Sequence, residues 1–580
     1  MASSNNKVLN KTSSLINLDR IFKYSVQPEL NNEYKTCCIL LDVNNPANLE
    51  TVMSKLIKQT ISAQIRTVLA NTESGFKNNK ITESMLTLEL GIPVPHMMNF
   101  IFLRYDSGLI DTRSLYKFLE SLRELGGHIY YSLSKNELRN FNFIMPGLKV
   151  TKYLFCVLEG FLMAMYAFKK YKSTKQAKIP EFKDQVLNSV KVKGGVRILL
   201  KGGATKKARI HPIIKSANPN NYAINIIYHG VSVSKIKGLM LDIGQLVTIM
   251  KSIYMCRDLI NEPGNILTTS SITTIIPKMV KDYKVPLDIK ILTATDCKKQ
   301  GMGLLVAVGS GSDAERQSGL VILTYNGGGR TKRNNPAKSF CLIGKGITQD
   351  TGGYSLKDVD DIVDMKSDKS GACIMLATIM CCARLQLPVN IVAMLPLAQN
   401  SIGPSAMVPG DIVTAYNGLT VEITDPDAEG RLILADCIAY AVDKYPGHQI
   451  IDMATLTFEQ EAVSCKKYST LIEVNSADIA DKLVIAGEIE GERIVKMPFI
   501  QDFEDAVSSD VADLKNSAST CQGDIYPSAM FMASFLKPDS RWIHIDLGGN
   551  TFKVDADYLE PGALASGVGV KLLMNLMLGA

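Results

Sequence analysis

The sequence of 580 residues lacks an uninterrupted apolar run of the length that crosses a membrane, about 20 residues. Its longest apolar stretches are Leu154–Phe168, which contains Glu159, and Ala372–Ala398, which contains Arg384 and Pro388. We therefore expect no membrane-spanning helix and no membrane partner.

Histidine is scarce, and its spacing excludes two common kinds of hydrolase. The chain has six histidines with no HExxH motif and no paired spacing, and it contains no GxSxG motif. A histidine-ligated zinc site and a Ser–His triad are therefore both disfavoured. A catalytic metal would have to be held mainly by carboxylates.

The cysteines and the N-terminus bear on the compartment. Twelve cysteines occur without a CxxC pair, which favours reduced thiols over a disulfide framework. The first eighteen residues lack the apolar core of a secretory signal, and they contain Ser and Lys but no acidic residue. Because mitochondrial presequences are usually rich in Arg, we expect a cytoplasmic protein, with mitochondrial import as the alternative.

The positive net charge of +7 comes from one segment. Between Met165 and Lys215 there are fourteen Lys or Arg residues against Glu181 and Asp184, a local excess of +12. Such a segment can contact nucleic acid or anionic lipid. More often such a segment is a solvated linker, which is the interpretation we favour. Nucleic-acid binding is the weaker alternative, and a salt-dependent gel shift of duplex DNA would test it.

The length and composition indicate a globular protein of more than one domain. Apolar residues make up 46% and charged residues 21% of the chain, and 580 residues exceed the usual size of one domain. We predict an N-terminal, non-catalytic α/β domain over 1–190, a basic linker over 191–235 and a larger C-terminal α/β domain over 236–580. In the last, apolar strand-like runs alternate with helical patterns, which predicts a mixed, largely parallel sheet flanked by helices. The expected strands are Gly319–Tyr325, Ser339–Ile343, Val389–Leu395, Val421–Ile423 and Gln449–Met453, and the expected helices include Gly371–Leu385 and Leu432–Lys444.

Three short segments collect the charged residues that could carry chemistry. They are Leu342–Lys357 (LIGKGITQDTGGYSLK), Asp364–Ala372 (DMKSDKSGA) and Val421–Leu432 (VEITDPDAEGRL). Each lies at the carboxyl end of an expected strand or just before an expected helix, where open α/β sheets place their sites.

The carboxylates of these segments suggest a metal site. If Asp427, Glu429 and Arg431 are extended, their spacing sends all three side chains the same way. Clustered carboxylates repel unless they are protonated or neutralised, and divalent cations are a common neutraliser. With Asp350 and Asp368 there are four carboxylates, whose charge two divalent ions would balance. From the residues alone, ordinary surface loops remain the alternative.

The same three segments resemble the signatures of the leucyl aminopeptidase (cytosol aminopeptidase) family of two-metal exopeptidases. That family reads roughly VGKGxTFDSGGxSLK, MKxDMxGA and NTDAEGRL, in this order and at similar separations. The resemblance covers about residues 250–550. Further matching segments are Arg257–Leu267, Gly301–Ser312, Pro409–Asp411 and Asp452–Thr457.

The resemblance implies a metal-ligand set and a choice of ions. Two divalent ions per subunit are implied, Zn²⁺ or Mn²⁺ with Mg²⁺ as a further choice, and Lys345 would bind one of them as a neutral amine with a strongly lowered pKa. The implied ligands are Lys345, Asp350, Asp368 and Glu429 for one ion, and Asp350, Asp427 and Glu429 for the other.

The resemblance also implies two catalytic residues and a substrate pocket. Lys357 would polarise the scissile carbonyl, and Arg431 would hold a bicarbonate that serves as proton shuttle. Peptides cleaved after an N-terminal leucine or other apolar residue are the implied substrates, and a homohexamer is the implied assembly. The positions implied to contact substrate are Met365, Thr455, Leu456 and Phe458.

Some positions depart from the family pattern. Phe458 replaces a glycine next to the substrate, Asp425 and Pro426 replace Asn-Thr before Asp427, and Lys369 replaces a methionine beside Asp368. The expected function is a metal-dependent aminopeptidase. The alternative is a weakly active or inactive relative with a structural role.

Overall fold

The structure is a computed structural model of the chain, which divides into two compact units. The first unit runs to Val247 and takes in residues 557–560, and the second contains the rest of the chain from Thr248. The division falls within one long helix, α7 (Val233–Asn261). The residues described are 22–27, 36–42, 83–89, 97–105, 115–135, 140–144, 151–171, 222–227, 233–328, 339–457, 459–464, 466–518, 523–554, 559 and 564–579.

The first unit contains a six-stranded sheet. Its order is β1-β6-β5-β2-β4-β3, and all neighbouring strands are parallel except β3 and β4. The predicted basic linker lies mostly outside the described residues, so it and the predicted domain bounds remain predictions. The strands are β1 (Phe22–Gln27), β2 (Thr36–Asp42), β3 (Glu83–Glu89), β4 (Met97–Tyr105), β5 (Asn140–Ile144) and β6 (Tyr222–Ile227).

Two helices of this unit, α5 (Leu115–Lys135) and α6 (Thr151–Ala164), pack closely against each other. A Cβ on Gly160 would lie 1.8 Å from the carbonyl oxygen of Arg123, so the helices can approach this closely only with glycine there. The buried Arg123 Nε donates to Glu159 Oε2 at 3.1 Å. The charge that interrupts the apolar stretch Leu154–Phe168 is therefore neutralised by a charge on the neighbouring helix.

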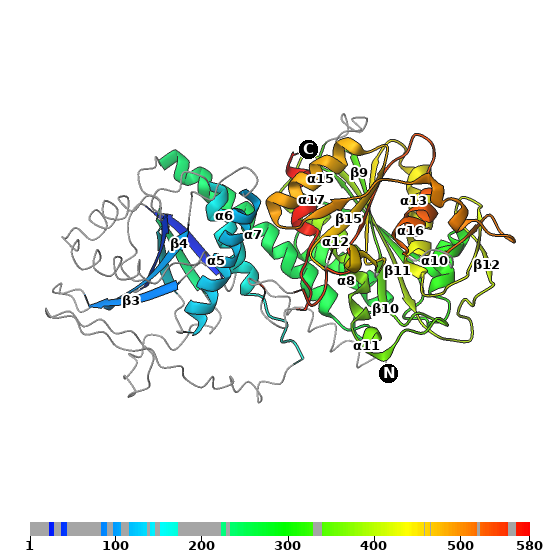
Figure 1. The fold of residues 1–580 in the computed structure, drawn as a ribbon, viewed down its shortest axis with the longest axis horizontal. Coiled ribbons are helices and arrows are strands. Elements are labelled where there is room, and N and C mark those ends of the chain that lie inside the picture. The colour runs from blue at the N-terminus through cyan, green and yellow to red at the C-terminus, as the bar shows by residue number, and fades with distance from the viewer. Residues whose placement is uncertain are drawn as a thin grey trace. The chain divides into compact units, whose positions relative to one another are not determined.

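The second unit is built on a nine-stranded mixed sheet (Figure 1). The order is β16-β15-β18-β14-β9-β11-β8-β7, and β10 extends the pairing with β11. The central run β18-β14-β9-β11 is parallel, whereas β15–β18, β11–β8 and β8–β7 are antiparallel. The strands are β7 (Asp288–Thr293), β8 (Gly319–Asn326), β9 (Ser339–Gly344), β10 (Gly346–Asp350), β11 (Asn390–Asn400), β14 (Gln449–Ala454), β15 (Ser469–Val474), β16 (Ile494–Lys496) and β18 (Arg541–Asp546).

Helices cover both faces of this sheet (Figure 1). α12 (Ser370–Arg384) packs on β9, β11 and β14 and contacts α17 (Val570–Gly579), while α13 (Glu429–Lys444) packs on the same strands and contacts α10 (Gly303–Val308) and α16 (Ile525–Ala533). Nearly every residue of α12 and α13 is buried, as expected for helices between a sheet and an outer layer.

The remaining elements of the second unit are mostly short. They are α8 (Thr269–Asp282), α9 (Ala294–Lys299), α11 (Val359–Ile362), η7 (Met365–Lys369), α14 (Glu459–Ser464), α15 (Ala477–Glu490), η8 (Gln501–Phe503), η9 (Asp505–Val507) and a small sheet of β12 (Ile412–Thr414), β13 (Thr420–Glu422) and β17 (Leu514–Lys515).

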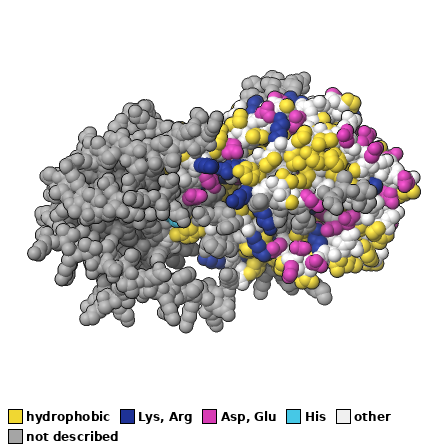
Figure 2. Space-filling model, viewed as in Figure 1, with side chains coloured by type: hydrophobic (Ala, Val, Ile, Leu, Met, Phe, Trp, Pro, Cys, Tyr) yellow, Lys and Arg dark blue, Asp and Glu magenta, His cyan; other side chains and the backbone are white. Residues whose placement is uncertain are grey.

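The predicted fold class of this unit is confirmed, since the predicted strands correspond to β8, β9, β11, β13 and β14 and the predicted helices to α12 and α13. Among the described residues, no helix is both long enough and apolar enough to span a membrane. On the face of the second unit drawn in Figure 2, acidic, basic and apolar side chains are interspersed, so the basic excess of residues 165–215 is not repeated there.

Candidate metal centre

Lys345 lies at a break between two strands. It is the single residue between β9 and β10, and this break falls opposite Pro396 of β11, which has no N–H to continue a regular ladder. Its backbone is fixed on both sides, because its N–H donates to Met453 O at 3.1 Å and its carbonyl accepts from Ala372 N at 2.8 Å. The side chain is thus held at the point where β14 and α12 meet the two strands.

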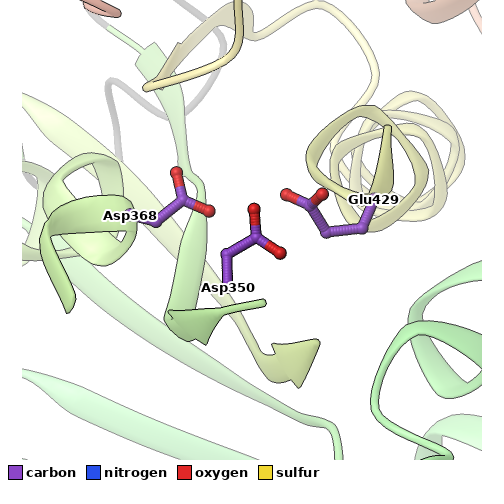
Figure 3. Close-up of side chains that lie close together, drawn as sticks. All are labelled: Asp350, Asp368 and Glu429. Atoms are coloured by element: carbon purple, nitrogen blue, oxygen red, sulfur yellow. The ribbon is translucent and has the colours of Figure 1, made fainter. Parts of the chain in front are cut away.

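The acidic residues come from the ends of three further elements. Asp350 is the last residue of β10, Asp368 lies in η7 just before α12, and Glu429 is the first residue of α13. Carboxylates at the start of a helix are stabilised by its dipole. The three side chains offer oxygens that all lie within 4.8 Å of one another, and Figure 3 shows their carboxylates directed toward a shared space.

Two lysines lie among these carboxylates. Lys345 Nζ is 2.8 Å from Asp368 Oδ1 and 2.8 Å from Glu429 Oε1. Lys357 Nζ is 3.0 Å from Asp350 Oδ2 and 2.5 Å from Asp427 Oδ1. The structure therefore brings together all five predicted ligand positions and the predicted catalytic lysine, whose roles remain to be proposed below.

The burial of this cluster shifts its pKa values. Burial and the nearby charge of Glu429 raise the pKa of Asp368 to about 7, although Lys345 opposes the shift. Burial and the charge of Asp350 raise the pKa of Asp427 to about 8. Burial would lower the pKa of Lys345, but the surrounding carboxylates outweigh it and raise the pKa. In the described residues, the ammonium groups of Lys345 and Lys357 supply positive charge among these carboxylates.

The residues present fit a divalent cation. Asp368 Oδ2 and Glu429 Oε2 are buried and accept no hydrogen bond from the described residues. Buried carboxylate oxygens in this condition are costly, and hard divalent cations prefer such ligands. A lysine amine beside them adds the nitrogen ligand that Zn²⁺ also accepts.

Gly430 makes room for Lys345 next to the first residue of α13. A Cβ at this position would lie 2.5 Å from Lys345 Cε and 2.8 Å from its Nζ. Any larger residue must therefore displace the tip of the Lys345 side chain.

Two residues support the cluster from β11 and from the loop after β14. Asn400, at the end of β11, donates through Nδ2 to Asp350 Oδ1 at 2.9 Å and to Pro426 O at 3.0 Å. Thr455 donates its hydroxyl to Asp368 Oδ1 at 2.7 Å, and its carbonyl accepts from Lys345 Nζ at 2.8 Å; its contact with substrate stays a prediction. The sequence analysis does not identify Asn400 as a site residue. The feature of the sequence that could have pointed to it is its position at the carboxyl end of a buried strand.

The loop before Asp427 keeps the aspartate in the cluster despite its proline. Asp427 N donates to Asp425 Oδ1 at 2.9 Å, and Asn400 holds the carbonyl of Pro426. Pro426 therefore removes one N–H donor but leaves both of these contacts intact. Lys369 forms no ion pair with the cluster, because its ammonium donates to the carbonyls of Glu262 and Lys366, and burial lowers its pKa to about 8.

The predicted geometry around Arg431 is wrong. Because α13 begins at Glu429, the Glu429 and Arg431 side chains lie on a helix, where residues two apart point in different directions. The Arg431 guanidinium donates to the carboxylate of Asp524 and to Asn516 O at 3.0 Å, and neither partner was foreseen. Burial lowers the pKa of Arg431 to about 10.

The other predicted substrate positions are only partly placed. Met365 is the half-buried first residue of η7, three positions before Asp368, and Leu456 is partly buried and packs against the main core. Phe458 lies outside the described residues, so its effect on a pocket remains a prediction.

The second unit is an α/β domain with a mixed β-sheet. Near the ends of its strands lies a buried acidic cluster in contact with a lysine, which makes the chain a protein with a candidate metal centre. The sequence pattern of the cytosol aminopeptidase family, catalytic domain, matches residues 254–574, and the chain belongs to this family.

Curated relatives agree with this assignment, and solved structures share the fold. The chain is 35% identical over 324 residues to the probable cytosol aminopeptidase of Chlorobium limicola, covering 56% of this chain and 61% of that protein. It is 30% identical over 431 residues to the probable cytosol aminopeptidase of Syntrophotalea carbinolica, covering 74% of this chain and 76% of that protein. The fold is similar to the bottromycin maturation enzyme BotP in complex with Mn, at a TM-score of 0.69 and 20% identity over 94% of this chain and 98% of that one. The match spans about three fifths of the length of relatives such as the Chlorobium protein.

Proposed function

We propose that this chain is a metal-dependent aminopeptidase that removes an N-terminal apolar residue, such as leucine, from peptides. The observation that carries the proposal is the buried cluster around Lys345, with two carboxylate oxygens that lack any described hydrogen-bond donor. Membership of the cytosol aminopeptidase family supports the same reaction.

The ligand positions would hold two divalent ions. Lys345, Asp350, Asp368 and Glu429 would hold one, and Asp350, Asp427 and Glu429 the other. When bound, two such ions lower the pKa of a water toward neutrality and can hold the free amine of a peptide. Manganese is the metal named for BotP, and zinc suits the mixed oxygen and nitrogen ligands equally well.

Lys357 is the residue best placed to act on the substrate carbonyl. Its ammonium lies between Asp350 and Asp427, and the neighbouring charges raise its pKa against the effect of burial, so it carries a proton to donate. A buried donor of this kind stabilises the oxyanion that forms when a carbonyl is attacked. Thr455 and Asn400 would keep the ligands in position, and Met365 would line the pocket for the first side chain.

The assembly and compartment follow from the family as expectations. We propose a homohexamer acting on peptides in the cytoplasm, with the mitochondrion as the alternative compartment. A sedimentation mass near that of one chain, 63.5 kDa, would contradict the hexamer.

Hydrolysis of leucyl-aminomethylcoumarin by metal-stripped protein tests the activity. Turnover should return with Mn²⁺ or Zn²⁺ in the wild type and not in Lys357→Ala or Asp427→Ala. Lys444→Ala is the matched control, because its charge pairs with Asp443 at the surface, and it should behave as the wild type. A folded, metal-loaded wild type that cleaves no N-terminal residue in a panel of substrates would support the inactive structural relative instead.

A further inference from the structure

Asn516 is a fully buried residue that the small sheet carries to the loop before α13. It directly follows β17, which pairs in parallel with β13, so the chain leaves the two strands side by side. Its N–H donates to Glu422 O at 3.1 Å, and its carbonyl accepts from Arg431 Nη1 at 3.0 Å. Both are backbone contacts, which a substitution of the side chain leaves in place. Residues 423–428, between β13 and α13, are called the Asp427 loop below.

The side chain of Asn516 uses both ends of its amide on the Asp427 loop. Its Oδ1 accepts from Thr424 N at 2.8 Å and from Asp425 N at 3.2 Å. Its Nδ2 donates to Asp425 O at 2.7 Å and to Ala428 O at 3.3 Å. An asparagine side chain offers one acceptor oxygen and two N–H donors, so the whole amide is engaged with this one loop.

These contacts lie on both sides of Asp427. Thr424 and Asp425 precede it and Ala428 follows it, and Asp425 Oδ1 also accepts from Asp427 N at 2.9 Å. Pro426 has no backbone N–H, so the loop has one donor fewer with which to hold itself. The position of Asp427 therefore depends on an amide from a distant part of the chain.

The other ligand positions are held by other elements. Lys345 is fixed by its backbone bonds to β14 and α12, Asp350 ends β10, and Asp368 lies in η7. Glu429 is the first residue of α13, which packs on the central strands of the sheet. Asp427 is thus the ligand position on the bracketed loop, and it belongs to only one of the two proposed ions.

We propose that Asn516 is a positioning residue for Asp427, and that it thereby sets the affinity for the ion that Asp427 helps to hold. The proposal rests on the proposed function, because the two ions and the ligand role of Asp427 belong to that function. Residues that support metal ligands change metal affinity by about 10- to 100-fold when they are replaced. Because Asn516 holds the backbone and not the carboxylate itself, we expect the lower end of this range, for one ion of the two.

Titration of the metal-stripped protein with Mn²⁺, followed by calorimetry and electron paramagnetic resonance, tests the proposal. Asn516→Asp keeps the acceptor oxygen and removes both N–H donors. It should bind one Mn²⁺ as the wild type does and the other about tenfold more weakly. Two Mn²⁺ ions that share carboxylate ligands are magnetically coupled, so at intermediate Mn²⁺ concentrations the coupled signal should decrease in this variant and the signal of an isolated bound ion should increase.

Asp427→Ala shows whether Asn516 acts through Asp427. This variant should lose the same ion, and adding Asn516→Asp to it should cause little further loss, because both changes then act on one contact. Additive losses in the double variant would overturn the proposal. Unchanged binding of both ions to a folded Asn516→Asp protein, or a wild type that binds fewer than two ions, would overturn it as well.

Asn390→Ala is the matched control for the loss of a buried amide. Asn390 is 6% exposed at the start of β11, at the opposite end of the strand from Asn400, and its Oδ1 accepts from Gly328 N at 3.1 Å. Its replacement should lower the urea unfolding midpoint and change the affinity for neither ion. Asn516→Ser, which retains a hydroxyl group, replaces Asn516→Asp if that variant does not fold. If neither folds while Asn390→Ala does, the amide is required by the fold itself and the proposal fails.

Hydrolysis of leucyl-aminomethylcoumarin separates this proposal from the proposed function. If the wild type binds two ions and Asn516→Asp weakens one, but no protein cleaves any substrate, the proposed function fails and the role of Asn516 stands. If the wild type cleaves the substrate and Asn516→Asp matches it in metal binding and in cleavage, the role of Asn516 fails and the proposed function stands.

Discussion

The second unit buries two kinds of carboxylate, and they differ in what their oxygens contact. Asp436 of α13 accepts from Leu305 N at 2.9 Å and from Tyr416 N at 2.8 Å. Asp546, at the end of β18, accepts from the backbone of Leu456, Thr457 and Gly548 and from the Thr457 hydroxyl. These carboxylates meet donors that the fold itself supplies, so they stabilise the connections between segments.

The carboxylates of the candidate metal centre are arranged differently. Asp368 and Glu429 each have a buried oxygen without a described donor, and they lie against other carboxylates. The comparison shows that the fold supplies donors to its structural carboxylates, whereas those of the centre keep oxygens without a described donor, which is the arrangement that the proposed cation site requires. Substitutions in the two groups should therefore have opposite signatures.

The largest effect is expected for Glu429→Gln. The change keeps the shape of the side chain but removes the charge of one ligand. Loss of a residue that only hydrogen-bonds to a ligand lowers metal affinity by up to about 100-fold, so loss of the ligand charge itself should lower it further. The metal-free protein should be as stable as the wild type or more so, because a buried like-charge repulsion is relieved. Metal titration and urea unfolding measure the two effects, and a destabilised metal-free variant would contradict the comparison.

Asp436→Asn should give the opposite result. The amide group of Asn cannot accept from both backbone N–H groups, so one is left unsatisfied, at a cost of about 2 kcal/mol in the free energy of unfolding. Metal affinity of the folded protein should be unchanged. If Asp436→Asn lowers metal affinity but keeps the urea unfolding midpoint of the wild type, Asp436 belongs with the carboxylates of the candidate metal centre.

The pH dependence of stability sharpens the same comparison. Burial raises the pKa of Asp436 from 3.8 to about 7, so the folded protein binds more protons than the unfolded chain between these values. The stabilising contribution of Asp436 to the free energy of unfolding is therefore fully present below about pH 4 and is lost as pH rises toward 7. The stability advantage of the wild type over Asp436→Asn should shrink between pH 5 and 7, by up to about 1.4 kcal/mol per pH unit. Urea unfolding of the metal-free proteins measures it, and a constant or widening gap would refute the assignment.

The smallest effect is expected for Gly430→Ala. The added methyl displaces the flexible tip of Lys345 and should weaken metal binding about tenfold, in the range of other changes near ligands. Stability should hold, since alanine favours helix over glycine by about 0.5–1 kcal/mol. Gly238→Ala in α7 is the control, because a Cβ there meets no atom within 4 Å. Equal metal affinity in both variants would contradict the expected effect of displacing the Lys345 tip on metal binding.

The sequence predicts the charged residues of the candidate metal centre better than the residues that hydrogen-bond to them. Lys345 and Asp350, and likewise Asp427 and Glu429, lie within a few residues of each other, so short motifs are sufficient to find them. Asn400 lies fifty residues from Asp350 in the chain, and an uncharged amide at the end of a strand has no distinctive local pattern. Such a contact follows from strand pairing, which the local sequence does not specify.

The helix boundary at Glu429 explains the error at Arg431. The string DPDAEGRL has extended-loop features up to Asp427, including Pro426, and the predicted helix began at Leu432. The three-residue difference turns Arg431 away from the direction of Glu429 and toward Asp524, ninety-three residues further along the chain. Boundaries of this kind depend on tertiary contacts, here the bonds of Asn516 to the loop, and not on local propensity alone.

The anchoring of Lys345 has a consequence for folding kinetics. Its backbone is bonded to β14 and α12, and its ammonium contacts residues in η7 and α13 and, 110 positions away, Thr455. These contacts are non-local, and non-local contacts form late and slowly. We therefore expect the centre to be assembled only after β14 has paired with β9 and α12 has packed on them, so the rate at which a refolding chain acquires the proposed metal affinity would report the pairing of these central strands.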